Sequence, residues 1–411
     1  MPCQFFLMGS SFVTGYDNYT FGERIYHSNQ TGIMKKYLHI LLVPALCTQL
    51  AAQVKVDDYY RKSDGKDQSR AIQRAFDHLD SLGHGSVEFT GTRTYYVEED
   101  IELPRYTKYG SRTIVLNGNG CLIKAANNVN VFNRIPKNQG EALNKMMSTR
   151  FVINDFVFRG GSKAINLGAT YGSCINRCTF ITQRVAAVDI QFGLMTQINE
   201  CIATNCFKDS FVLRHGGAWG GNGANSQSNH SVISSCRVYA KAGANTAFKI
   251  LASSGCVLRD IISEGSSDIQ YSIYADRLTS TTVRLFKIEN FHLEHAPVKA
   301  GIYVNITGIA DIDGVFYQLS HEEFPLVLSG PSADHINLSN IPNWVRGTVI
   351  EQQRTGRGTA WVMDHCNKNF YKNENWRCRG EGGIIENKKP YWFTGQGYKD
   401  QAKKKFGDVA D

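Results

Sequence analysis

The stretch INRCTF at residues 175–180 carries the pattern that decides the fold: an aliphatic residue, two mostly polar residues, then cysteine or an apolar residue. Eight segments share this pattern, and the aliphatic residues that open them, which we call anchors, lie 22 to 35 positions apart. The anchors are Ile153, Ile175, Ile198, Ile233, Leu258, Ile288, Ile312 and Ile336. A degenerate repeat with a period in the twenties and variable insertions is typical of a solenoid, in which each repeat stacks on the next.

Each repeat also contains a second short apolar segment, found at residues 165–167, 188–190, 211–213, 248–250, 273–275, 302–304 and 326–328. These segments alternate inward, outward, inward, which is the period of a strand. The anchor segment breaks that period, and a two-residue bend between strands explains the break, because Asn and Asp tolerate left-handed conformations. About three strands per repeat predict an all-β, right-handed parallel β-helix. A leucine-rich repeat is disfavoured, since its LxxLxL pattern and its helix are both missing.

Cysteines occupy one slot of three successive repeats, at Cys178, Cys201 and Cys236. We expect them to stack in the interior as free thiols, because parallel Cβ vectors on neighbouring strands suit a disulfide badly. No pair of cysteines has CxxC spacing, so neither a metal nor another cofactor is expected.

The N-terminal region is typical of a secreted protein. Residues 34–36 are a basic start, residues 37–46 form a short apolar core, and residues 50–52 offer a small-residue cleavage site. We therefore interpret residues 34–52 as a signal peptide and residues 1–33 as an over-extended start or an N-terminal extension. The apolar core is too short to span a membrane, so stable membrane insertion is not expected. The predicted localisation is periplasmic, cell-surface or extracellular.

A helix is predicted at residues 69–79, because its apolar residues fall on one face, and it would cover the open end of the first coil. The motifs DGKD (64–67), AIQRA (71–75), GSVEF (85–89), YYV (95–97) and IELP (101–104) surround and include it. Together they resemble the N-terminal cap of the pectate-lyase-like β-helix superfamily, and with the repeats the resemblance covers roughly residues 57–345. It implies the fold but no single chemistry, because the superfamily includes lyases, glycoside hydrolases, phage tailspikes and non-catalytic scaffolds. Tailspike relatives trimerise, and the sequence leaves a homotrimer open.

The expected organisation is a cap with first coils at residues 53–149, the β-helix coils at 150–345, and a C-terminal cap or small β appendage at 346–411. The formal net charge of +8 suits an acidic glycan. The sequence has no clustered basic stripe, no zinc finger and no aromatic platform of the kind that binds nucleic acids, so nucleic-acid binding is not expected.

Outward residues of the second segment predict a groove for a polysaccharide. One row is Asn166, Asp189, Val212, Lys249, Tyr274, Tyr303 and Val327, and a second row is Gly168, Gln191, Arg214, Leu251, Asp276, Asn305 and Ser329. The tyrosines could stack on sugar rings, and Lys249 or Arg214 could hold a carboxylate. Trp219, on a glycine-rich loop, is either a further platform or tucked under its own loop. The alternative is an ordinary solvated sheet face.

Two glutamates give a second, sharper hypothesis. Glu264 and Glu294 each lie six places after an anchor, so stacking brings their backbones to about 5 Å. Retaining glycosidases hold two carboxyl groups about 5–5.5 Å apart. We interpret this pair as acid and base or nucleophile, with Asp189 and Lys249 as further catalytic candidates and His295 and Asp276 as substrate-binding residues.

Three functions stay open from the sequence. A glycoside hydrolase that uses the glutamates is favoured. A polysaccharide lyase would use Lys249 or Tyr274 as base and Arg214 to neutralise a uronate carboxylate. A non-catalytic glycan-binding or surface scaffold protein would need only the tyrosine stripe.

Overall fold

The computed structural model describes residues 52–105, 112–220, 226–278, 283–295, 297–317, 326–329, 335–339, 349–352, 360–362, 377–379, 381–386 and 389–394. The chain divides into two units, Met1–Leu50 and Ala51–Asp411, and all of these residues belong to the second. The predicted signal peptide therefore lies outside the described residues, apart from its last position. None of the helices in the described ranges is long and apolar enough to cross a membrane.

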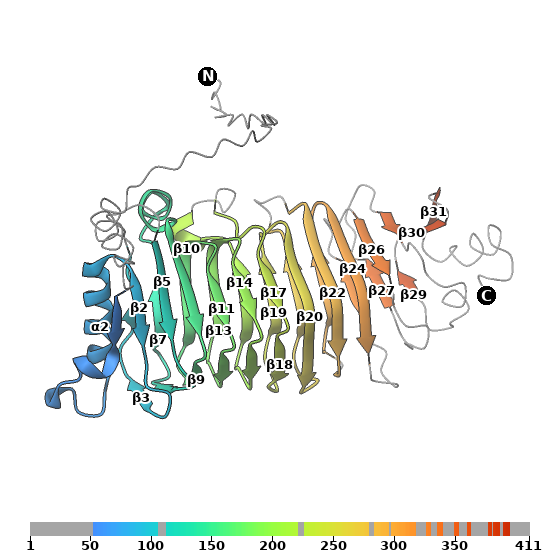
Figure 1. Cartoon of the computed structure of the whole chain (residues 1–411). Helices are drawn as coiled ribbons and strands as arrows, with labels where there is room; N and C mark the ends of the chain where they lie inside the picture. The colour runs from blue at the N-terminus through green and yellow to red at the C-terminus, as the bar shows by residue number, and fades with distance from the viewer. Residues whose placement is uncertain are drawn as a thin grey trace, which may run out of the picture. The chain divides into compact units, whose positions relative to one another are not determined.

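The second unit is a stack of β coils (Figure 1). Its described strands form an 18-stranded sheet, here called sheet A, and an 11-stranded sheet, here called sheet B, and every pairing within these two sheets is parallel. The described exception is the antiparallel pair β30 (Glu381–Glu386) and β31 (Lys389–Thr394). The prediction of an all-β, right-handed parallel β-helix is confirmed.

Sheet A contains β1 (Gln53–Lys55), β2 (Gly85–Glu88), β3 (Thr94–Val97), β5 (Arg112–Asn117), β6 (Leu122–Ala125), β8 (Thr149–Asn154), β9 (Val157–Gly160), β11 (Cys174–Asn176), β12 (Thr179–Ile181), β14 (Gln197–Asn199), β15 (Ile202–Thr204), β17 (Val232–Ser234), β18 (Arg237–Ala240), β20 (Cys256–Gly265), β22 (Leu285–Leu293), β24 (Ile309–Tyr317), β26 (His335–Ser339) and β28 (Ala360–Val362). Sheet B contains β4 (Ile101–Glu102), β7 (Asn130–Arg134), β10 (Lys163–Tyr171), β13 (Ala186–Leu194), β16 (Asp209–Arg214), β19 (Thr246–Leu251), β21 (Tyr271–Asp276), β23 (Ala300–Asn305), β25 (Val327–Ser329), β27 (Val349–Gln352) and β29 (Arg377–Arg379). Parallel pairing thus continues past residue 345.

Each coil crosses sheet A as two short strands, or as one strand with a bend. The second polar residue after the anchor has a positive φ in successive coils: Asp155, Arg177, Glu200, Ser235, Asp260, Asn290 and Gly314. The predicted two-residue bend is therefore present. The first polar residue has another role, since the amides of Asn154, Asn176 and Asn199 form a ladder with N–O distances of 2.9 and 3.0 Å.

The anchors pair in register from Ile153 to Ile312, which confirms the repeat. The prediction of Ile336 as the last anchor was wrong, because Ile312 pairs with Leu338 and Ile336 pairs with Ala310. Both aliphatic residues fit the same strand face, so the pattern there could not decide between them.

Three further anchors precede the first one that the sequence revealed. Val54 pairs with Val87, Val87 with Leu116, and Leu116 with Ile153. The solenoid therefore begins well before the repeat becomes visible in the sequence.

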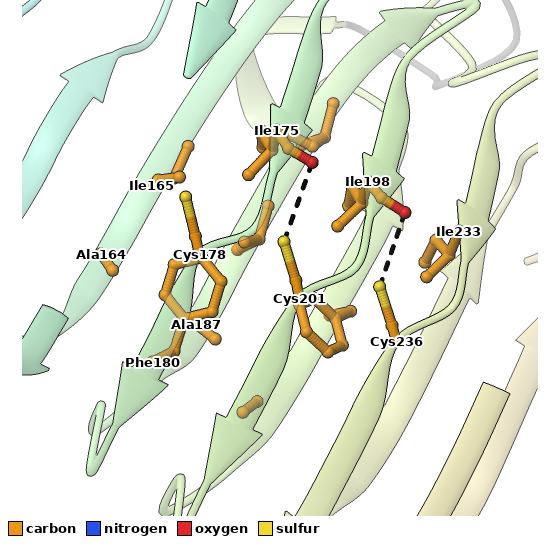
Figure 2. Packing of buried hydrophobic residues seen from close by; sticks show 14 of the residues in the cluster. Ala164, Ile165, Ile175, Cys178, Phe180, Ala187, Ile198, Cys201, Ile233 and Cys236 are labelled. Atoms are coloured by element: carbon orange, nitrogen blue, oxygen red, sulfur yellow. Dashed lines mark hydrogen bonds between the residues drawn. The ribbon is translucent and has the colours of Figure 1, made fainter. Parts of the chain in front are cut away.

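The cysteines stack in the interior as predicted (Figure 2). The Sγ atom of Cys201 lies 3.7 Å from the carbonyl oxygen of Ile175, and that of Cys236 lies 3.5 Å from the carbonyl oxygen of Ile198. Cys178, Cys201 and Cys236 are buried free thiols. Burial raises the pKa of Cys178 and Cys236, so both stay protonated and pack as small apolar groups.

The N-terminal helix α2 (Ser69–Leu82) forms where the apolar pattern predicts it, after the short helices η1 (Val56–Tyr59) and η2 (Lys62–Asp64). Its apolar face is buried, and the Phe76 ring lies 5.8 Å from the Phe132 ring of sheet B. Gly83 ends the helix in a left-handed conformation, with its N–H donating to the Leu79 carbonyl at 3.0 Å.

Candidate functional site

The outward rows of sheet B run across successive coils. Pairing places Asn166, Asp189, Val212, Lys249, Tyr274 and Tyr303 in one row, and Gly168, Gln191, Arg214, Leu251, Asp276 and Asn305 in the second. The first row also extends back to Asn133 and Glu102, which sequence reasoning missed.

The last member of each predicted row needs correction. Tyr303 pairs with Leu328, whereas Val327 pairs with Ile302 and is buried, and Ser329 pairs with Val304. Residues 326–328 are all aliphatic, so their pattern fits either phase of the strand and could not fix the outward face.

The first part of the rows is covered by other segments. The short helix α3 (Gln139–Glu141), the π-helical turn η3 (Ala142–Met146) and the 3-10 turn η4 (Gly217–Gly220) precede or follow sheet B strands in the chain. Met146 packs with Phe192 and Trp219 in a small apolar cluster separate from the main core. Asn166 and Gln191 are buried although they point outward from the solenoid. The rows are therefore buried at Asn166 and Gln191.

Asp189 is the centre of an ion-pair network in this covered part. It is only 3% exposed, and its carboxylate lies 2.6 Å from Lys163 Nζ and 2.7 and 2.9 Å from two nitrogens of Arg214. Burial alone would raise the pKa of Asp189, but Arg214 and then Lys163 outweigh it, so the pKa is lowered. Asp189 and Arg214 thus bind each other, and the catalytic and carboxylate-binding roles predicted for them stay predictions.

Trp219 follows the second of its two predicted alternatives. Its indole N–H donates to Gln191 Oε1 at 3.1 Å, and its ring lies 6.2 Å from that of Phe192. Its ring packs against β13.

The open part of the rows begins at β19 and forms a cavity of about 400 Å³. Its lining residues are Asn245, Thr246, Lys249, Leu251, Gln270, Tyr271, Tyr274, Asp276, Leu278 and Lys299. The predicted residues Lys249, Tyr274 and Asp276 therefore meet in one cavity. Sequence reasoning missed Tyr271 and Lys299, because it followed only two outward positions of each strand and neither residue occupies one.

Three tyrosine rings form a cluster, and two of them, Tyr271 and Tyr274, line this cavity. Tyr274 and Tyr303 stack with ring centroids 4.7 Å apart and an interplanar angle of 12°. Tyr271 lies 5.0 Å from the Tyr274 ring at a tilt of 58°. The stacking follows from register, since the two residues pair directly on neighbouring strands.

Asp276 fixes the orientation of the cluster. Its Oδ2 accepts a hydrogen bond from the Tyr274 hydroxyl at 2.9 Å, and its Oδ1 accepts from Asn305 Nδ2 and from the Leu278 N–H, each at 3.0 Å. Burial raises the pKa of Tyr274 above its usual range, and the charge of Asp276 raises it further. Burial also raises the pKa of Tyr303 to about 12. Both phenols keep their protons, so Tyr274 is a hydrogen-bond donor and a poor base.

Two lysines stand at the cavity in different settings. Lys249 Nζ lies 3.0 Å from Asp209 Oδ2, and burial raises the pKa of Asp209 although Lys249 opposes the effect. Lys299 Nζ lies 5.5 Å from the centroid of the Tyr271 ring.

The two glutamates lie on sheet A, and neither lines the cavity. Glu264 is in β20 and Glu294 follows β22, where its N–H donates to the Ser263 carbonyl at 3.0 Å, so they occupy consecutive coils. Arg237 Nε lies 3.2 Å from Glu264, and His292 Nε2 lies 2.9 Å from Glu294. The side chains are 17% and 33% exposed. The sequence-predicted residues therefore belong to two separate surfaces.

His295 lies inside the solenoid and is 1% exposed, so the structure does not support it as a substrate-binding residue. Its Nδ1 donates to the Ser266 carbonyl at 2.9 Å, and its Nε2 lies 2.8 and 2.9 Å from the hydroxyls of Ser263 and Ser272. Burial lowers the pKa of His295. Among the described residues, no group of three or more His, Cys, Asp or Glu side chains is arranged to hold a metal ion.

Neither a protein-family model nor a curated protein sequence matches this chain. Among solved structures, the chain is similar to the A-module of a mannuronan C-5 epimerase from Azotobacter vinelandii, with 14% identity, 81% of this chain and 99% of that chain covered, and a TM-score of 0.48. It is also similar to a mutant tailspike protein of E. coli bacteriophage HK620 in complex with a pentasaccharide, with 11% identity, 80% and 67% coverage, and a TM-score of 0.47. A third is a hyperthermoactive exopolygalacturonase from Thermotoga maritima, with 11% identity, 84% and 94% coverage, and a TM-score of 0.33.

Proposed function

We propose that this protein binds a polysaccharide across β19, β21 and β23, and that some of the sugar units occupy the tyrosine-lined cavity. The observation that carries the proposal is the cluster of Tyr271, Tyr274 and Tyr303, of which Tyr271 and Tyr274 line one open cavity and Tyr303 stacks on Tyr274. An aromatic ring offers an apolar face for the C–H face of a sugar ring, and its hydroxyl offers a polar edge.

The remaining groups at the cavity suit the same ligand. The volume of about 400 Å³ lies within the usual range for small-molecule sites, roughly 300–1,000 Å³. Asn245, Gln270 and the two lysines line it, and such polar groups fix the orientation of a ligand that the aromatic rings bind. Parallel coils repeat this surface about every 4.8 Å, which favours an extended, repetitive ligand over a compact one.

The tyrosines provide the test. Binding of the purified protein to a panel of immobilised neutral and acidic polysaccharides would be measured for the wild type, Tyr274→Ala and Tyr303→Ala. We expect each substitution to weaken binding at least about tenfold, which corresponds to ~1.4 kcal/mol. Tyr171→Ala is the matched control, because Tyr171 is an exposed tyrosine of sheet B that does not line the cavity. Unchanged affinity in both the Tyr274→Ala and the Tyr303→Ala variant would contradict the proposal.

Hydrolysis of the bound chain by Glu264 and Glu294 is a second candidate. The observation that favours it is that both partly exposed carboxylates occupy consecutive coils, with the backbone of Glu294 bonded to that of Ser263. The partner of Glu264 weighs against it, because Arg237 forms an ion pair with that carboxylate, and a carboxylate held in an ion pair is a poor proton donor.

New reducing ends and the ultraviolet absorbance of unsaturated uronates, followed together, separate the chemistries. Hydrolysis gives reducing ends alone, and we expect Glu264→Gln and Glu294→Gln each to lower that rate at least a hundredfold. Full activity in both variants would remove the glutamates from the mechanism. Absorbance would indicate elimination, for which Lys249 is the remaining base, since the raised pKa of Tyr274 opposes that role.

Export belongs to the same proposal, because residues 34–52 match the pattern of a secretory signal. The homotrimer stays a prediction from the family resemblance, and light scattering of the purified protein tests it.

A further inference from the structure

Lys299 differs from the other charged side chains at the cavity. Its ammonium lies over the Tyr271 ring, 5.5 Å from the centroid, and it makes no ion pair with any carboxylate in the part of the chain that the structure describes. A cation–π contact at an exposed site is worth only about 0.5–1 kcal/mol. The tyrosine therefore holds the ammonium at the cavity without neutralising its charge.

The acids near the cavity are already engaged. The lining contains two lysines and one carboxylate, that of Asp276. Both oxygens of Asp276 accept hydrogen bonds from within the protein, from Tyr274, Leu278 and Asn305. The charge of Lys249 is balanced by Asp209 at 3.0 Å. The one cationic charge at the lining without such a partner among the described residues is that of Lys299.

We infer that Lys299 is a specificity-determining residue that binds an anionic substituent, a carboxylate or a sulfate ester, on the sugar next to Tyr271. The inference rests on the proposed function and adds a substrate class to it. An ammonium group offers three donors and a full charge, and both oxyanions accept such bonds more strongly than a neutral hydroxyl does. Apart from Lys249, whose charge Asp209 balances, the other donors of the cavity are neutral amides and hydroxyls, which serve neutral and anionic sugars alike.

The test compares three oligosaccharides of equal length: one that carries uronate carboxylates, its carboxyl-reduced neutral form, and a sulfated one. Dissociation constants would be measured by calorimetry for the wild type, Lys299→Gln and Lys299→Arg, at low and high salt. We expect Lys299→Gln to weaken binding of an anionic ligand about tenfold and to change binding of the neutral ligand less than about twofold. Lys299→Arg should keep most of the preference. If Lys299→Gln weakens binding of the uronate ligand, the recognised group is the carboxylate, and if it weakens binding of the sulfated ligand, the recognised group is the sulfate.

Lys241→Gln is the matched control, because Lys241 also lies over an aromatic ring, 4.8 Å from the Phe207 centroid, but does not line the cavity. If Lys299→Gln left all affinities unchanged, or weakened neutral and anionic ligands equally, the inference would be overturned while glycan binding stood. If the wild type bound none of the three and none of the polysaccharide panel, the proposed function would fail first. Lys299 is exposed, so the variant is expected to fold, and its thermal unfolding midpoint verifies that.

Discussion

At the residue scale, the position of a residue in the coil determines its backbone conformation more than its residue type does. The bends of sheet A place Arg177 and Glu200 in the left-handed region as readily as Asp155. The polar pair after each anchor predicted a bend. Which residue of the pair has the positive φ could not be predicted, because arginine and glutamate do not favour the left-handed region. Asn154, Asn176 and Asn199 instead occupy the preceding position, where side-chain amides on neighbouring strands reach one another.

His295 supports a prediction about pH. Burial lowers its pKa in the folded protein, so between that value and about 6.5 the unfolded chain binds more protons than the folded one. The free energy of unfolding should therefore fall as the pH drops below about 6.5. Urea denaturation from pH 7.5 to 5 would measure the slope.

His295→Gln is the comparison for that slope. The variant loses the titrating ring, so its stability should depend less steeply on pH across this window, whatever its stability at pH 7.5. Identical slopes in both proteins would contradict the role given to His295.

At the element scale, the apolar period predicted the strand order and register of the central coils. It failed at the ends for two physical reasons. In the segment from Leu116 to Cys121 the bend is two residues longer than in later coils, so the spacing that revealed the repeat is absent. Near Val327, consecutive aliphatic residues fit either face of a strand. The covering of sheet B by η3 and η4 could not be predicted, because it depends on contacts between distant segments.

Arg134 joins several elements and gives a prediction about stability. It is fully buried, and its guanidinium donates five hydrogen bonds, at 2.7–3.1 Å, to the carbonyls of Pro104, Arg105, Met146, Gly168 and Ala169. Burial lowers its pKa to about 9. Arg134→Lys keeps a cation but cannot reach five carbonyls, so we expect a loss of about 2–4 kcal/mol in the free energy of unfolding.

Chemical denaturation measures this loss, with the exposed Arg159→Lys as the control that should change stability by less than about 0.5 kcal/mol. A cost below about 1 kcal/mol for Arg134→Lys would mean that these carbonyls find other partners.

At the scale of the second unit, the sequence predicted a groove along the outward rows of sheet B, and the cavity described here is lined by residues of β19 and β21 and by their neighbours. Lys249, Tyr274, Tyr303 and Asp276 were placed together correctly, because strand register alone brings them together. The spacing of the repeat correctly placed Glu264 and Glu294 on consecutive coils. It could not show that they lie on sheet A, away from the cavity, because repeat spacing gives the coil of a residue and not its distance from a cavity.

The measurement that tests the central claim most directly is hydroxyl-radical footprinting of the tyrosines, with and without a saturating oligosaccharide that the protein retains. Binding at the cavity predicts protection of Tyr271 and Tyr274, while Tyr60, Tyr96 and Tyr171, which are 40%, 42% and 52% exposed, stay equally reactive. Protection confined to Tyr239, which pairs with Glu264 on sheet A, would contradict it and place the glycan at the glutamates instead.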